Sequence, residues 1–191
     1  MQTVDTHIAV RMVRLETGLG GVYGKVYWAS CSNPRRPCVV KVNSACVPSQ
    51  GDANKLKPLR QAVTEFEAEA AAMEKLKGID SVVQYIGKVD LSKLPEKDKL
   101  FFKGYLPIAL VMERVDAVGT VRDYLLSKQF RFGITTVQDL SARFTCIAEK
   151  VIKSYFDMWE RGLYQSDPTP GNILALRTEG PSGTHVKCPD I

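Results

Sequence analysis

The spacing of hydrophobic and polar residues in the first part of the chain is mostly that of β-strands. Apolar residues alternate with polar ones, or form short runs, between clusters of Gly, Pro, Asn and Ser. One segment, 59–77, is helical in pattern, because apolar residues recur there every three or four positions and Gly78 follows. A loop is expected at 43–57, and strands are predicted at 9–19, 22–29, 38–42, 82–89 and 107–115.

The pattern becomes helical after residue 119. Helices are predicted at 120–129 and 137–161, and Gly162 ends the second of them. Short strands are expected from residue 173 and at 185–188. Five strands with one helix make a small sheet domain, so the expected fold class is α+β, with the later helices beginning a second layer.

The composition is that of a globular chain. Of the 191 residues, 45% are hydrophobic and 25% are charged, which supplies enough apolar material for a core. No apolar run approaches the roughly 18 residues of a membrane helix, and the N-terminus lacks a signal-peptide pattern. We therefore expect an intracellular, cytoplasmic protein without a membrane partner. The five cysteines form no CxxC pair, which predicts free thiols and no zinc site.

The formal net charge of +5 is concentrated in the first third of the chain. Residues 1–60 carry nine Lys/Arg and three Asp/Glu, a balance of +6, whereas residues 61–191 carry seventeen and eighteen, a balance of −1. Such a basic segment can attract phosphates or an acidic partner. Because the basic residues are scattered, a solvated surface is the simpler interpretation, and nucleic-acid binding is not expected.

A glycine-rich segment lies between the first two predicted strands. In LGGVYGKV, Leu19, Gly21, Gly24 and Val26 match the spacing of G-x-G-x-x-G-x-V, with leucine in place of the first glycine. Glycine lets a hairpin approach phosphates closely because it has no Cβ. Glycines are also ordinary in hairpin turns, so this segment taken alone favours a structural role.

A lysine, Lys41, lies inside the otherwise apolar strand at 38–42. A buried ammonium requires a counter-charge, and the predicted helix carries Glu65, Glu67 and Glu69. We favour Glu69 as the partner because it shares a helix face with an apolar residue seven positions later, and Glu65 is the alternative. Lys41 could instead extend its ammonium to solvent from an edge strand.

Two polar residues, Asp167 and Asn172, lie five positions apart in the sequence DPTPGN after the long predicted helix. In phosphoryl transfer, an aspartate accepts the proton of the attacking hydroxyl and an asparagine oxygen ligates magnesium. Asp190, after the last predicted strand, would add a second oxygen ligand for a hard cation. Taken alone, the DPTPGN segment is also compatible with a simple Pro/Gly turn.

The order of these features along the chain resembles the protein kinase-like superfamily: a Gly-rich segment, a strand lysine, a helix glutamate, an Asp–Asn loop and a final aspartate. The resemblance covers about residues 10–191. It implies a kinase N-lobe at 1–115, with a five-stranded antiparallel sheet and one helix. It also implies a hinge and an incomplete helical C-lobe at 116–191, ending at the metal-binding Asp190.

The resemblance further implies ATP and Mg²⁺ as ligands. Lys41 would hold the α- and β-phosphates and Glu69 would orient Lys41, while Asp167 would act as the catalytic base and Asn172 and Asp190 would ligate magnesium. The residues implied at the nucleotide are Leu19, Gly21, Gly24 and Val26 from the Gly-rich segment, Met112 as gatekeeper, and the backbone of Glu113 and Val115 at adenine.

Some positions depart from the family pattern. Gln165 and Ser166 replace the usual His-Arg, and Thr169 replaces a lysine common in serine/threonine kinases. The chain given stops at Ile191, directly after Asp190, so by the resemblance it is a fragment or truncated form with little or no transferase activity. Three functions stay open: a protein kinase-type phosphotransferase with a Ser/Thr hydroxyl acceptor; a pseudokinase or nucleotide-binding interaction module; and a small-molecule kinase of the aminoglycoside or choline kinase type. A protein substrate or partner is compatible with the first two.

Overall fold

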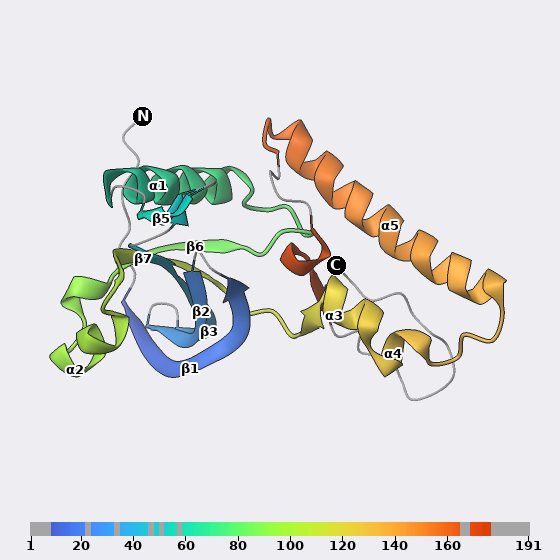
Figure 1. Ribbon diagram of the computed structural model, residues 1–191, viewed down its shortest axis with the longest axis horizontal. Coiled ribbons are helices and arrows are strands. Elements are labelled where there is room, and N and C mark those ends of the chain that lie inside the picture. The colour runs from blue at the N-terminus through green and yellow to red at the C-terminus, as the bar shows by residue number, and fades with distance from the viewer. Residues whose placement is uncertain are drawn as a thin grey trace. The chain divides into compact units, whose positions relative to one another are not determined.

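The structure is a computed structural model, and it describes residues 9–21, 24–32, 35–45, 48–49, 52–56, 59–164 and 169–176 (Figure 1). The chain divides into two compact units. Unit 1 comprises Met1–Gly78 and Val83–Arg114, and unit 2 comprises Ile79–Val82 and Val115–Ile191. The sequence-based division at residue 115 did not foresee that Ile79–Val82 belongs to unit 2. The strand predicted at 185–188 lies outside the described residues.

Unit 1 is built on a five-stranded antiparallel sheet with the order β1-β2-β3-β7-β6. This sheet, together with the helices, confirms the α+β class. The strands begin and end within about four residues of the predicted bounds, since apolar runs mark strand centres better than strand ends. Their bounds are β1 Val10–Gly21, β2 Gly24–Ser32, β3 Arg35–Ser44, β6 Tyr85–Asp90 and β7 Tyr105–Glu113.

The two faces of this sheet carry different side chains because residues of a strand alternate between faces. On one face, Val40 and Val42 of β3 are fully buried in a cluster with Val111 of β7. The opposite face is covered by helix α1 (Leu59–Lys75), which crosses the sheet in Figure 1. There Phe66, which is 0% exposed, packs into a second buried cluster.

The connections in unit 1 contain more structure than the sequence predicted. The loop expected at 43–57 holds two short paired strands, β4 (Pro48–Ser49) and β5 (Asp52–Leu56). The Pro, Gly and Ser content of the whole segment 43–57 is typical of a loop, so the sequence did not predict these strands. The connection between β6 and β7 forms short helical turns: η1 (Leu91–Lys93), α2 (Glu96–Lys99) and η2 (Leu100–Phe102).

Unit 2 is mainly helical, and its long helix α5 (Val137–Glu160) ends one residue before the predicted bound. The helix predicted at 120–129 is in fact two, α3 (Val121–Leu126) and α4 (Lys128–Arg131), because the Ser127 hydroxyl caps a new helix. Strand β8 (Ala117–Thr120), which the sequence did not predict, pairs with β9 (Leu174–Leu176). The turn η3 (Pro170–Asn172) precedes β9.

Both α3 and α5 begin with a capping box of the form T-x-x-D. Before α5, the Thr136 hydroxyl accepts from the Asp139 N–H at 3.1 Å, and the Asp139 carboxylate accepts from the Thr136 N–H at 2.9 Å. Hydrogen bonds from Thr136 and Thr135 lower the pKa of Asp139 to about 2. These boxes satisfy the N–H groups that a helix start leaves unpaired.

The cysteines differ from one another in their chemistry. Cys31 and Cys38 are free and buried, and burial together with the neighbouring Cys31 thiol raises the pKa of Cys38 to about 12. Cys146 is disulfide-bonded, so the prediction of free thiols is wrong for that residue. The absence of a CxxC pair does not show which cysteines, far apart in the sequence, lie close together in the fold.

Among the helices that the structure describes, none combines the length and the apolar character needed to cross a membrane.

Candidate functional site

A row of side chains crosses the face of the sheet beneath α1. In the strand registers, Val26 of β2 lies opposite Lys41 of β3, Lys41 lies opposite Leu110 of β7, and Leu110 lies opposite Lys88 of β6. Directly opposed residues share a face. Two residues that the resemblance assigned to the nucleotide, Val26 and Lys41, are therefore cross-strand neighbours.

Lys41 forms an ion pair with Glu69, since its Nζ contacts the Oε1 atom of that carboxylate. The two side chains are 34% and 32% exposed, so the ion pair is only partly buried. Glu65, the alternative partner, instead accepts a hydrogen bond from Gln61 one turn earlier on α1, at 3.0 Å. The burial of Phe66 explains the choice, because Glu69 follows it by three residues and projects beside it toward β3.

The sequence analysis missed a further residue of this cluster, Asn43. Its Nδ2 donates a hydrogen bond to Glu69 Oε2 at 3.2 Å, while Lys41 contacts Oε1. Both oxygens of Glu69 are thus held by β3. The available signal was the spacing: Asn43 is two residues after Lys41 on the same strand, so the two side chains lie on one face.

A second ion pair joins α1 to the sheet. Lys88 Nζ lies 2.5 Å from Glu67 Oε2, and the side chains are 11% and 48% exposed. Glu67 and Glu69 flank Phe66 on the helix, and Lys88 and Lys41 flank Leu110 in the row. The helix is therefore attached to the sheet on both sides of its buried phenylalanine.

The Gly-rich segment forms the paired ends of the β1–β2 hairpin. Gly21 lies opposite Gly24, Leu19 belongs to β1, and residues 22–23 at the tip lie outside the described residues. Gly24 is buried and lies opposite Asn43 of β3. A Cβ added at Gly24 would overlap the backbone oxygen of Val42 and stand 3.3 Å from the Asn43 Cα. Glycine at position 24 thus has a packing reason that does not depend on a nucleotide.

We expect Gly24→Ala to lower the free energy of unfolding by about 1–3 kcal/mol, because the obstructing group is backbone and a strand must move. Chemical denaturation followed by tryptophan fluorescence would measure this loss. Gly171→Ala is the matched control, since a Cβ added there would lie 3.9 Å from Thr169 Oγ1, an ordinary contact. Equal stability of the Gly24→Ala protein and wild type would contradict the packing role.

The residues predicted at adenine lie near the end of β7. Met112 lies opposite Val39, which places it on the same sheet face as Lys41. The Glu113 N–H donates to the Gln84 carbonyl at 2.9 Å, so only the carbonyl of Glu113 fits the predicted backbone contact. Val115 is described but belongs to unit 2.

Of the residues predicted for proton transfer and metal binding, only Asn172 is described. It is exposed at the end of η3, and its N–H donates to the Thr169 carbonyl at 2.9 Å. The next residue, Ile173, accepts from the Val121 N–H at 2.8 Å, which fixes the end of this loop to the start of α3. Asp167 and Asp190 lie outside the described residues. Within the described ranges, no group of three or more His, Cys, Asp or Glu could hold a metal ion.

No protein-family model matches the chain, and no curated protein matches it either. The case for a function therefore rests on the side chains described above.

Proposed function

We propose that the chain binds ATP in unit 1 and is an ATP-dependent phosphotransferase of the protein kinase type, with a Ser/Thr hydroxyl as acceptor. The observation that carries the proposal is the Lys41–Glu69 ion pair, which lies on the sheet face shared by Val26 and Met112. If Lys41 only extended its ammonium to solvent, it would not need Glu69, whose carboxylate also accepts a hydrogen bond from Asn43.

The chemistry of the pair suits a triphosphate. Glu69 keeps the Lys41 ammonium at a fixed place on the sheet, and about a third of the lysine side chain is open to solvent. A fixed ammonium can hold phosphate oxygens without first reorganising, which is the main way in which proteins stabilise phosphoryl transfer. Gly24, buried against β3, lets the β1–β2 hairpin pack closely on the strand that carries Lys41.

The proposed magnesium site has fewer described residues than the proposed nucleotide site. A bound magnesium ion would neutralise phosphate charge, and Asn172 offers an exposed amide oxygen of the hard type that magnesium accepts. One oxygen does not make a site, and by the resemblance Asp190 would supply the other protein ligand. Asp167 would accept the proton of the acceptor hydroxyl.

A pseudokinase, which binds nucleotide without transferring phosphate, is the second candidate. The exposed Thr169 favours it, because a lysine in that position would supply positive charge near the γ-phosphate. Nucleotide binding is common to both candidates, so binding is the property to test first.

The test is a thermal-shift titration with Mg-ATP. Since a ligand that binds only the folded state stabilises it, ATP at about 100 times its Kd should add roughly 2.7 kcal/mol and raise the Tm by several degrees. Lys41→Met should remove most of this shift. Lys88→Met is the matched control, because Lys88 is also a strand lysine paired with a glutamate of α1.

Two results would overturn nucleotide binding at this site: no shift at millimolar Mg-ATP in wild type, or an equal shift in wild type and Lys41→Met. A shift without transfer of labelled phosphate to a generic protein substrate would favour the pseudokinase. Transfer that is abolished by Asp167→Asn would favour the phosphotransferase.

A further inference from the structure

One side-chain oxygen beside the Lys41–Glu69 ion pair is buried without a hydrogen bond. It is the Oδ1 atom of Asn43, which finds no partner among the residues that the structure describes. The other end of the same amide, Nδ2, donates to Glu69 Oε2 at 3.2 Å. The amide of Asn43 therefore satisfies only one of its two polar ends, and that end contacts the carboxylate of the ion pair.

The stability of the sheet does not explain an amide at position 43. An amide oxygen that leaves water without a new partner destabilises the folded state, and most buried polar atoms in proteins are paired for that reason. Leucine has the same branching at Cγ as asparagine and carries no polar atom to bury. What asparagine supplies at position 43, and leucine would not, is the hydrogen bond to Glu69.

This bond determines how the Glu69 carboxylate faces Lys41. Lys41 and Asn43 lie two residues apart on one face of β3, and the carboxylate bridges them, with Oε1 on Lys41 and Oε2 on Asn43. The terminal torsion of a glutamate side chain is broad. A carboxylate held by Lys41 alone could therefore turn and offer both of its oxygens to the ammonium, whereas Asn43 keeps one of them away.

The number of oxygens that Glu69 offers to Lys41 matters for a phosphate ligand. An ammonium has three N–H donors. Contact with one carboxylate oxygen leaves two of these donors for phosphate oxygens, and contact with both leaves one. By holding Oε2, Asn43 keeps the ammonium in place while the carboxylate competes less with a ligand for the remaining donors.

We propose that Asn43 is a positioning residue of the phosphate-binding site, which acts through Glu69 and leaves two N–H donors of Lys41 to the phosphates of ATP. The inference rests on the proposed function, because Lys41 must bind those phosphates. It adds to the Lys–Glu pair of the resemblance a third side chain of this chain's own. Its consequence is that loss of the Asn43 amide changes ligand binding more than stability.

The first test is isothermal titration calorimetry of the full chain with Mg-ATP. Asn43→Leu should weaken binding about tenfold, which is the scale of one hydrogen bond to a charged group. Without ligand, its Tm should be no more than about 4 °C below that of wild type. The reason is that the substitution also removes the unpaired oxygen, and water can reach Glu69, whose side chain is 32% exposed.

Gln61→Leu is the matched control for this titration. Gln61 also donates an amide N–H to a glutamate of α1, since its Nε2 lies 3.0 Å from Glu65 Oε1. That bond is exposed and does not involve the carboxylate that pairs with Lys41. Gln61→Leu should therefore bind Mg-ATP with the affinity of wild type.

A second variant, Asn43→Asp, tests whether the hydrogen-bond donor is the property that matters. Its new carboxylate would face that of Glu69, so the two repel each other until one takes up a proton and donates it to the other. Relative to wild type at the same pH, Mg-ATP binding should be weak at about pH 8 and should recover toward about pH 5.5. Circular dichroism at the titration temperature should show every variant folded at each pH.

The possible results separate this inference from the proposed function. If wild type binds Mg-ATP and Asn43→Leu binds it equally well, Asn43 does not position the site, and nucleotide binding itself still holds. A lower Tm with unchanged affinity would likewise leave Asn43 a structural role only, and so would an Asn43→Asp protein whose binding does not recover at low pH. A wild type that does not bind Mg-ATP would overturn the proposed function and, with it, the role of Asn43.

Discussion

Replacing Phe66 with alanine is expected to lower the free energy of unfolding of unit 1 by about 3–5 kcal/mol. Phe66 is 0% exposed and fills the space between α1 and the sheet, where Leu106 and Leu110 belong to the same buried cluster. Truncation would remove that buried surface and leave a cavity that a paired sheet cannot close. Because Glu69 is one turn further along α1, the variant should also bind Mg-ATP more weakly if the proposed site is correct.

The two tryptophans allow each unit to be followed separately, since Trp28 lies in β2 of unit 1 and Trp159 lies in α5 of unit 2. In a Trp159→Phe background, urea unfolding monitored by Trp28 would report on unit 1. Val63→Ala is the matched control, because it shortens an apolar side chain of the same helix that is 38% exposed, and its effect should stay below about 1 kcal/mol. A similarly small loss for Phe66→Ala would show that Phe66 does not attach the helix to the sheet.

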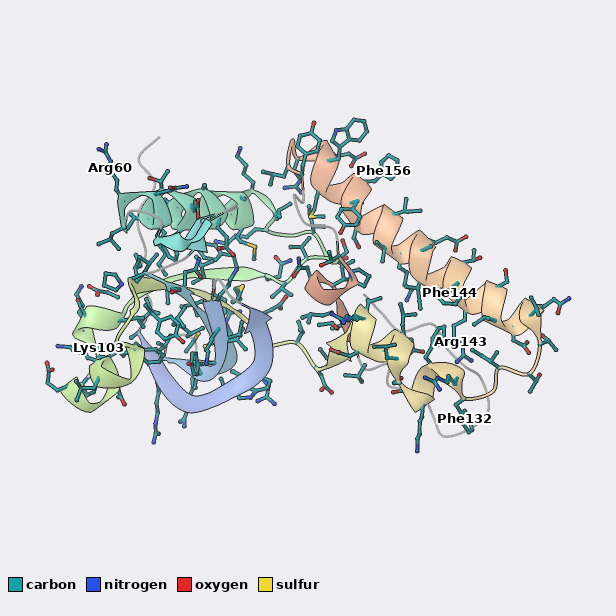
Figure 2. The ribbon with its side chains drawn as sticks, in the orientation of Figure 1. Arg60, Lys103, Phe132, Arg143, Phe144 and Phe156 are labelled. Carbon is teal, nitrogen blue, oxygen red and sulfur yellow. The ribbon has the colours of Figure 1, made fainter. Side chains whose placement is uncertain are left out.

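Arg143→Met is expected to lower the free energy of unfolding of unit 2 by about 3 kcal/mol, because it leaves buried carbonyls without their charged donor. Arg143 projects from α5, as Figure 2 shows, and is only 7% exposed. Its guanidinium donates to the carbonyls of Phe130 and, at 3.1 Å, Phe132, and it lies 5.7 Å from the centre of the Phe130 ring. These bonds attach the end of α4 to α5.

Urea unfolding of Arg143→Met in a Trp28→Phe background, followed by Trp159, would measure the loss. Arg131→Met is the control, since Arg131 is exposed and its guanidinium lies 3.4 Å from the Leu126 carbonyl. Its effect should be within about 0.5 kcal/mol. Arg143→Lys should fall between the two, because an ammonium cannot reproduce the fork of the guanidinium. Equal stability of Arg143→Met and Arg131→Met would show that the carbonyls find other donors.

The sheet and α1 were predictable from the sequence because their buried residues recur with the period of a strand in the sheet and with the period of a helix in α1. In β2, the buried residues Tyr27, Ala29 and Cys31 alternate with Trp28 and Ser30, which are more exposed, as the two-residue period of a strand requires. The partner of Lys41 was predictable for a related reason: only a glutamate beside the buried face of α1 can reach a strand beneath it. That inference favoured Glu69, and the structure pairs it with Lys41.

Other features had no periodic signal. Asn43 contacts a residue that is 26 positions away, so its spacing from Lys41 indicates the sheet face on which it lies but not its bond to Glu69. The hydrogen-bond partners of Arg143 are backbone carbonyls. They can accept from its guanidinium because α4 ends there. Strand β8 has four residues, one of them glycine, and it depends on β9 from a distant part of the chain.

The two ion pairs on either side of Phe66 also determine which orientations of α1 are populated. A rotation of α1 about its own axis that moved Glu69 away from Lys41 would also separate Glu67 from Lys88 and lift Phe66 from its cluster. Exposed pairs contribute about 0–1 kcal/mol each and the burial of Phe66 about 2–3 kcal/mol, so the rotated state would lie roughly 3 kcal/mol higher. Since 1.4 kcal/mol is a factor of ten, fewer than about 1% of molecules would hold Glu69 turned away before any ligand arrives.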